Sequence, residues 1–164
     1  MTDDQKRIKL KKFLEGDWEY YCKVTSKELF ENGEQMRGGV MTISVNIGWI
    51  GISAKINGIR LWAQAQGDAY LMDKEVVWKT DAGIRFTNDN ELSFSYAIAG
   101  SQGLGGITED SYVITPDMLK INPGTFKHQR NDGKMVMGRV QLRKMKNEKD
   151  FKWAPDGTVY RPDD

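Results

Sequence analysis

The first strand-like stretch of the sequence limits the possible folds more than any other. Apolar side chains occupy every second position from Trp18 to Val24, with polar residues at 19 and 23. A period of two is typical of a β-strand with one buried face. Gly16 precedes the tryptophan by two positions, and glycine permits close approach of the backbone to a neighbouring ring. The stretch therefore predicts a strand that opens a closed sheet, with Trp18 filling one end.

Residues 2–14 are expected to form a short helix before that strand. Thr2 and Gln5 have the spacing of a capping box, and acidic residues follow the cap where the helix dipole favours them. Five basic residues then alternate with four apolar ones. Two interpretations stay open: a basic helix that binds a surface, or a lid that covers the barrel and turns its lysines to water.

The rest of the chain predicts short strands separated by turns rich in glycine and asparagine, with no central helix. Gly38-Gly39 is expected to bend a strand running from about Met36 to Ile47. Asn57-Gly58 predicts a two-residue hairpin loop that pairs Ile56 with Ile59. This pattern indicates an all-β fold, an antiparallel up-and-down β-barrel of about eight to ten strands with a short N-terminal helix. Residues 1–146 are expected to form a single barrel domain, and residues 147–164 a polar C-terminal tail.

A short helix entering a Gly16-Asp17-Trp18 strand, followed only by strands, resembles the start of a lipocalin or related calycin barrel. The resemblance implies a cavity that opens at one end and holds a small molecule. In lipocalins an arginine near the end of the last strand packs over the opening tryptophan. The resemblance gives that role to Arg139 or Arg143 over Trp18.

The same Gly16-x-Trp18 start, with the segment from Trp49 to Ala54, is also similar to the cytosolic barrels of bacterial anti-phage effectors that sense cyclic dinucleotides. Those relatives carry two transmembrane helices before the barrel, and this sequence has none. That resemblance therefore implies a soluble sensor, or a sponge that sequesters the signal, as an alternative function.

Charge and cysteine content exclude several classes of function. The sequence has 24 Lys and Arg against 23 Asp and Glu, and this balance disfavours a nucleic-acid binder that relies on bulk charge. Cys22 is the only cysteine, so no internal disulfide or cysteine-based metal site is expected. No stretch reaches the roughly 18 apolar residues of a membrane span, and the charged N-terminus does not resemble a secretory signal. We therefore expect a cytoplasmic protein, with its oligomeric state open.

The last predicted hairpin supplies the candidate ligand-binding residues. With Asp132-Gly133 as a two-residue loop, one face carries Phe126, His128, Arg130 and Arg139 beside two methionines. If this face points inward, it suits an anionic, partly aromatic ligand. The alternative places Val136, Val140 and Leu142 inside and leaves the arginines in solvent. Arg60 and Trp62 alternate onto one face of an earlier strand, and we group them with the first set. The predicted ligand-binding residues are Arg60, Trp62, Phe126, His128, Arg130, Arg139, Gly103 and Gly105.

Gly103 and Gly105 belong to a glycine-rich run, residues 100–106. A phosphate-binding loop would lie between a strand and a helix, but a strand is expected to follow here. The run is therefore interpreted as a hairpin tip, which can act as a movable lip at the mouth of the barrel.

No set of residues predicts catalysis. The strand serines lack a G-x-S-x-G elbow, and His128 is the only histidine available as a base. No cofactor is predicted. Haem ligation by His128, as in nitrobindin-like barrels, is an alternative, although the ligand in those barrels lies near the chain end. The sequence thus predicts non-catalytic binding of a small molecule, with a barrel enzyme of the isomerase kind or a protein-interaction scaffold as further alternatives.

Overall fold

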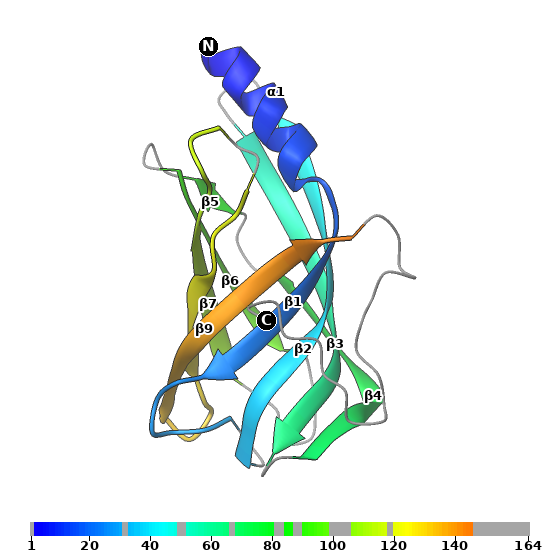
Figure 1. The fold of residues 1–164 in the computed structure, drawn as a ribbon, viewed down its shortest axis with the longest axis vertical. Coiled ribbons are helices and arrows are strands. Elements are labelled where there is room, and N and C mark those ends of the chain that lie inside the picture. Colours follow the sequence, from blue (N-terminus) through cyan, green and yellow to red (C-terminus); the bar gives the residue numbers. More distant parts are fainter. Residues whose placement is uncertain are drawn as a thin grey trace.

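The computed structural model describes residues 2–30, 33–48, 52–65, 68–80, 84–86, 90–98, 106–117 and 120–145. In these ranges one helix, α1 (Asp3–Leu14), precedes nine antiparallel strands (Figure 1). The strands are β1 (Gly16–Val24), β2 (Glu34–Ile47), β3 (Ile52–Ala65), β4 (Asp68–Thr80), β5 (Arg85–Phe86), β6 (Glu91–Ile98), β7 (Ile107–Val113), β8 (Gly124–Gln129) and β9 (Met135–Lys144).

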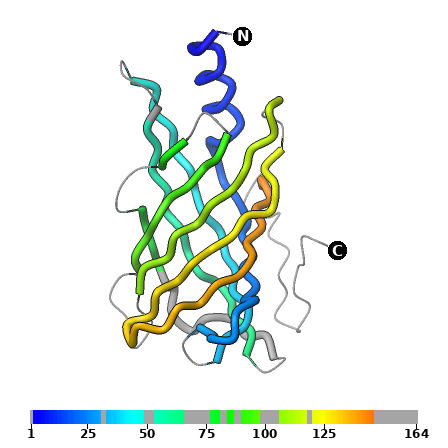
Figure 2. Tube along the Cα trace, turned by 90° about the vertical axis from the view of Figure 1, so that its left-hand side faces the viewer, coloured from blue at the N-terminus to red at the C-terminus, as the bar shows by residue number. Residues whose placement is uncertain are grey.

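Eight of these strands close into a barrel. Consecutive strands pair from β1 to β4 and from β6 to β9, β1 pairs with β9, and β4 pairs with β6. The two-residue β5 pairs with β6 as an extra strand. Figure 2 shows the strands running obliquely around a common axis. The predicted all-β antiparallel barrel with an N-terminal helix is confirmed. The predicted tail, residues 147–164, lies outside the described residues.

Helix α1 covers one end of the barrel with its last turns. The predicted capping box is present, because the Thr2 hydroxyl accepts from the Gln5 backbone N–H and the Gln5 side chain accepts from the Thr2 backbone. Leu10 and Leu14 are buried in the core, and the Trp18 indole donates to the Leu14 carbonyl at 2.8 Å. These contacts favour the lid interpretation of the helix (Figure 1).

A lysine, rather than an arginine, packs over Trp18. The Lys144 Nζ lies 5.6 Å from the centre of the Trp18 ring and donates to the carbonyls of Lys12 and Phe13. The expectation for Arg139 or Arg143 is wrong because strand register pairs residue 144 with Trp18. Arg143 instead bonds the Glu19 carboxylate, with 3.1 Å between Nη2 and Oε2.

The predicted Asn57-Gly58 hairpin is also wrong. Both residues lie inside the continuous strand β3, where Gly58 pairs with Met41 on one side and Trp78 on the other. A Cβ atom added at Gly58 would stand 2.0 Å from Cε2 of Trp78. The glycine therefore makes room for an indole ring rather than a turn, and the predicted Ile56–Ile59 pairing is absent from the described register.

We predict that Gly58→Ala lowers the free energy of unfolding by about 1–3 kcal/mol, the usual cost of overpacking a core. The added methyl group collides with the Trp78 ring, which is held on its other side. Urea denaturation measures the loss. The matched control is Asn57→Ala, an exposed neighbour on the same strand, which should change stability by less than about 0.5 kcal/mol.

A Trp78→Leu background tests the cause of the loss. If the ring is responsible, Gly58→Ala should cost much less there than in the wild type. Equal losses in the two backgrounds would show that Gly58 serves the backbone and not the ring.

Candidate functional site

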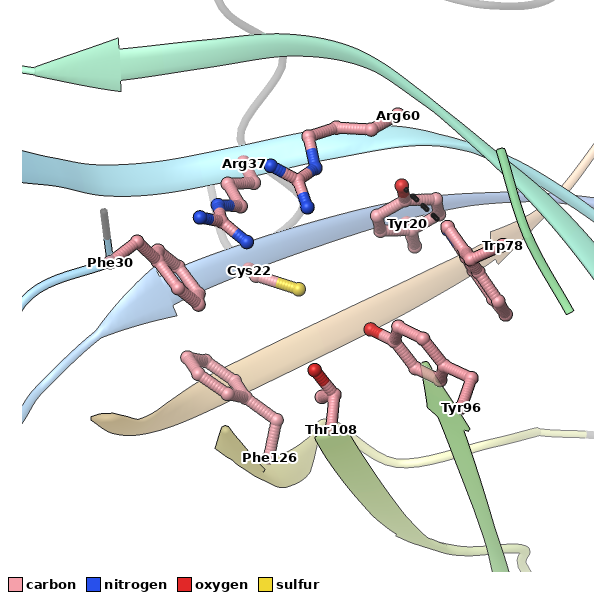
Figure 3. Close-up of a pocket in the computed structure, with 9 residues that line it drawn as sticks. All are labelled: Tyr20, Cys22, Phe30, Arg37, Arg60, Trp78, Tyr96, Thr108 and Phe126. Atoms are coloured by element: carbon pink, nitrogen blue, oxygen red, sulfur yellow. Dashed lines mark hydrogen bonds between the residues drawn. The ribbon is translucent and has the colours of Figure 1, made fainter. Parts of the chain in front are cut away.

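Aromatic and aliphatic side chains pack the barrel interior and leave a small cavity in the half opposite α1. Its volume is about 20 Å³. An ordered water needs about 10–15 Å³ by this measure, so the cavity admits one water or a comparably compact group. Residues from seven strands and the β1–β2 connection line it (Figure 3): Tyr20, Cys22, Phe30, Arg37, Arg60, Trp78, Tyr96, Thr108 and Phe126.

Two arginines reach this cavity from neighbouring strands. Arg37 of β2 and Arg60 of β3 have side chains only 7% and 3% exposed, and Figure 3 shows their guanidinium groups close together. The Arg37 Nε donates to Oε2 of Glu34 at 2.9 Å. The Arg60 Nη1 lies 3.9 Å from the same oxygen, which is too long for a hydrogen bond. One buried carboxylate therefore contacts two buried cations.

The site is short of negative charge as a result. Burial and, to a smaller extent, the positive charge of Arg60 lower the pKa of Arg37 to about 10, and Glu34 opposes both effects. Within the described part of the chain, Nη1 of Arg60 has no hydrogen-bond partner. A buried cation without full compensation is costly, and a bound anion would supply the missing charge.

Neutral polar groups form the opposite wall. The Tyr96 and Thr108 hydroxyls point toward the space below the arginines in Figure 3. Thr108 Oγ1 is also 2.8 Å from Nδ1 of His128. Burial raises the pKa of the Cys22 thiol well above its ordinary value, so Cys22 is a neutral thiol at pH 7 and not a nucleophile. Hydroxyls beside guanidinium groups suit recognition of an oxyanion.

A second buried acid lies on β7 outside the cavity lining. Asp110 is 4% exposed and accepts from the Tyr112 hydroxyl at 2.9 Å. Burial raises the pKa of Asp110 to about 7, and the Tyr112 hydrogen bond acts against this rise. Near neutral pH the carboxyl is therefore partly protonated and does not provide a full counter-charge for the arginines.

The structure brings only some of the predicted site residues together. Arg60 and Phe126 line the cavity, and His128, which is buried, bonds the cavity residue Thr108. Gly103 and Gly105 lie outside the described residues.

Trp62 does not share a face with Arg60. A shift of register between them places Arg60 opposite Gly39 and Trp62 opposite Gly38. Trp62 then packs on Tyr21, in a cluster separate from the main core, with ring centres 5.4 Å apart. The alternation that grouped Arg60 with Trp62 is broken by this bulge.

The predicted register of the last hairpin is wrong by one residue. Arg130 and Lys134 close a three-residue loop whose Gly133 has φ of +87°, so Gln129 pairs with Met135 and Phe126 with Gly138. The predicted shared face therefore splits. Phe126 and His128 are buried together with Val136 and Val140, the two valines that the alternative interpretation placed inside. Arg139 is exposed.

Arg130 lies at the turn itself. Its Nη1 donates to the Leu29 carbonyl at 3.1 Å, and its Nη2 is 2.7 Å from Asp132 Oδ2. These partners lie on the barrel rim, so Arg130 does not join the arginines that line the cavity.

Of the nine residues that line the cavity, only Arg60 and Phe126 were predicted from the sequence. The missed residues include Phe30, Arg37 and the Arg37 partner Glu34. For Arg37 a signal was present, because Met41, Ile43 and Val45 mark odd positions of β2 as inward-facing. A charged residue at an odd position of β2, such as Arg37, is therefore expected to point into the barrel. Phe30 and Glu34 lie at or before the start of β2, where no alternation of polar and apolar residues indicates which way a side chain points.

Among the described residues, no three His, Cys, Asp or Glu side chains gather as a metal site needs. No helix in that part of the chain combines the length and apolar character required to cross a bilayer. The chain matches no family model, no curated protein and no solved structure. Fold and site thus define it as a closed eight-stranded antiparallel barrel, compatible with a lipocalin- or calycin-like one, with two buried arginines at an internal cavity.

We predict that Asp110 makes the protein lose stability as pH rises from about 4 to about 7. The folded protein keeps the Asp110 proton up to about pH 7, whereas the unfolded chain releases it near the ordinary aspartate pKa of 3.8. Folding therefore binds a proton in this window, and stability falls with pH by up to roughly 4 kcal/mol.

Asp110→Asn should match the wild type near pH 4 and be the more stable of the two at pH 8, as urea denaturation at each pH would measure. Glu109→Gln is the matched control, because this exposed neighbour on β7 should leave the pH profile unchanged. Parallel profiles for the wild type and Asp110→Asn would contradict the assignment.

Proposed function

We propose that this protein binds a small organic anion inside its barrel, without transforming it, and that Arg37 and Arg60 hold the anionic group. The observation that carries the proposal is the charge imbalance at the cavity: two buried guanidinium groups share one carboxylate, and Nη1 of Arg60 has no hydrogen-bond partner among the described residues. Arginine donors pair with carboxylate and phosphate in a fixed geometry, so this arrangement is prepared for an oxyanion.

The cavity also limits what is bound. At about 20 Å³ it accepts a compact group such as a carboxylate, in the place that a water would otherwise take. The hydroxyls of Tyr96 and Thr108 supply further donors on the opposite wall. The rings of Phe30, Phe126 and Trp78 surround these polar groups, which favours an organic ligand over an inorganic ion.

Titration calorimetry with a panel of probes tests the proposal: acetate, inorganic phosphate, benzoate, laurate, a cyclic dinucleotide and haem. The panel includes the cyclic-dinucleotide and haem alternatives. We predict that at least one carboxylate binds the wild type and that Arg60→Met weakens it at least tenfold, which is roughly 1.4 kcal/mol. Arg139→Met is the matched control, since Arg139 is exposed on β9 and should not affect binding.

Stability separates a binding role for Arg60 from a structural one. In Arg60→Met the hydrogen bond of 2.9 Å between Arg37 and Glu34 remains. The substitution removes only the Arg60 guanidinium, a buried cation whose charge is not fully balanced. The variant should therefore be at least as stable as the wild type. A panel with no binder, or binding that is unchanged in Arg60→Met, would overturn the proposal.

A further inference from the structure

The β1–β2 connection places a phenylalanine ring against the anion site. Phe30 belongs to no strand, yet its side chain is only 3% exposed. Its ring is stacked on Phe126 with 5.4 Å between centres and 14° between planes. The Arg37 guanidinium carbon lies 3.6 Å from the centre of the Phe30 ring, and the His128 ring meets it edge-on at 5.5 Å. Phe30 thus occupies a slot whose contacts select a flat, electron-rich ring.

The same slot adjoins the space for the anion. Phe30, Arg37, Arg60 and Phe126 all line the cavity. A ring in the place of Phe30 has the Arg37 guanidinium against it, and the Arg60 guanidinium lies next to that of Arg37 (Figure 3). The arginine that stacks on the ring also belongs to the pair that lacks negative charge. A carboxylate attached to such a ring would reach the cavity without any change in the strands.

Phe30 is held by the connection and not by a strand ladder. The backbone N–H of Phe30 donates to the Glu34 carbonyl and its carbonyl accepts from the Gly33 N–H, both at 3.2 Å. The adjacent Leu29 carbonyl accepts from Arg130. The connection lies at the end of the barrel opposite α1 (Figure 1). The other cavity residues belong to paired strands, so Phe30 is the part of the lining that moves at the least cost in backbone hydrogen bonds.

We propose that the ligand is a planar aromatic carboxylate whose ring takes the place of Phe30, between Phe126 and Arg37, while its carboxylate meets Arg60. In the free protein Phe30 occupies the ring position itself. The inference rests on the proposed function, because it assigns a chemical class to the anion held by the two arginines.

The test measures benzoate binding to the wild type and to Phe30→Ala by calorimetry. Removal of the competing ring should strengthen benzoate binding at least tenfold. Cyclohexanecarboxylate, which has the same charge and a similar size but no aromatic face, should bind Phe30→Ala at least fivefold more weakly than benzoate. Phe13→Ala, which removes a ring at the α1 end of the barrel, is the matched control and should not change benzoate affinity. If Phe30→Ala does not fold, Phe30→Leu gives the same comparison with more of the core filled.

A vacated apolar cavity can bind aromatic molecules for that reason alone, so toluene is the necessary comparison. A slot that belongs to the anion site should prefer benzoate to toluene by at least tenfold in Phe30→Ala. The double variant Phe30→Ala/Arg60→Met should lose this preference and keep toluene binding. Equal affinity for toluene and benzoate, or no preference for benzoate over cyclohexanecarboxylate, would overturn the ring assignment.

Acetate separates this inference from the proposed function. If acetate binds in a manner that depends on Arg60 but benzoate gains nothing from Phe30→Ala, the anion site stands and the aromatic class is wrong. If neither acetate nor any other panel anion depends on Arg60, both proposals fail.

Discussion

The barrel closes where β4 pairs with β6, and the indole ring of Trp78 stabilises this seam. Among the described residues, three pairs join β4 to β6: Trp78 with Ile98, Lys79 with Ala97 and Thr80 with Tyr96. The ring lies on Gly58 of β3, stacks on Tyr96 with 4.0 Å between centres, and donates to the Tyr20 hydroxyl. One side chain thus ties β4 to three other strands. The cavity depends on this closure, because its arginines come from one side of the seam and its hydroxyls from the other.

Local patterns predicted those features that local chemistry determines. The capping box predicted the helix, and the alternation from Trp18 to Val24 predicted the strand β1. The expected single buried face was too narrow, since Glu19 and Tyr21 on the other face are buried as well. The paired glycines at 38 and 39 lie where the register with β3 shifts, and the extra residue is on β3. The capping box and the alternation each depend on residues within a few positions of one another, so one sequence is enough to find them.

Features that depend on partners across the sheet were mispredicted. Asn57-Gly58 has the composition of a turn, but the glycine serves a ring that is 20 positions away in the sequence. In the last hairpin the turn was located correctly, yet one additional loop residue reversed the face of every side chain on β9 relative to β8. Arg37 was missed for a different reason, because the buried odd positions of β2 already mark residue 37 as inward-facing and this local signal was not used.

Lys144 joins the end of β9 to the end of α1, and β1 pairs with β9 along seven residue pairs. The first strand therefore cannot complete its pairing until the last strand has been synthesised. On a ribosome that adds about 5–20 residues per second, β1 leaves the exit tunnel several seconds before its second neighbour exists. Throughout that time the nascent chain presents an unpaired edge with Trp18, Tyr20 and Cys22 uncovered, and such an edge can pair with another chain. The β1–β9 pairing thus leaves β1 open to association with other chains for as long as the protein is being synthesised.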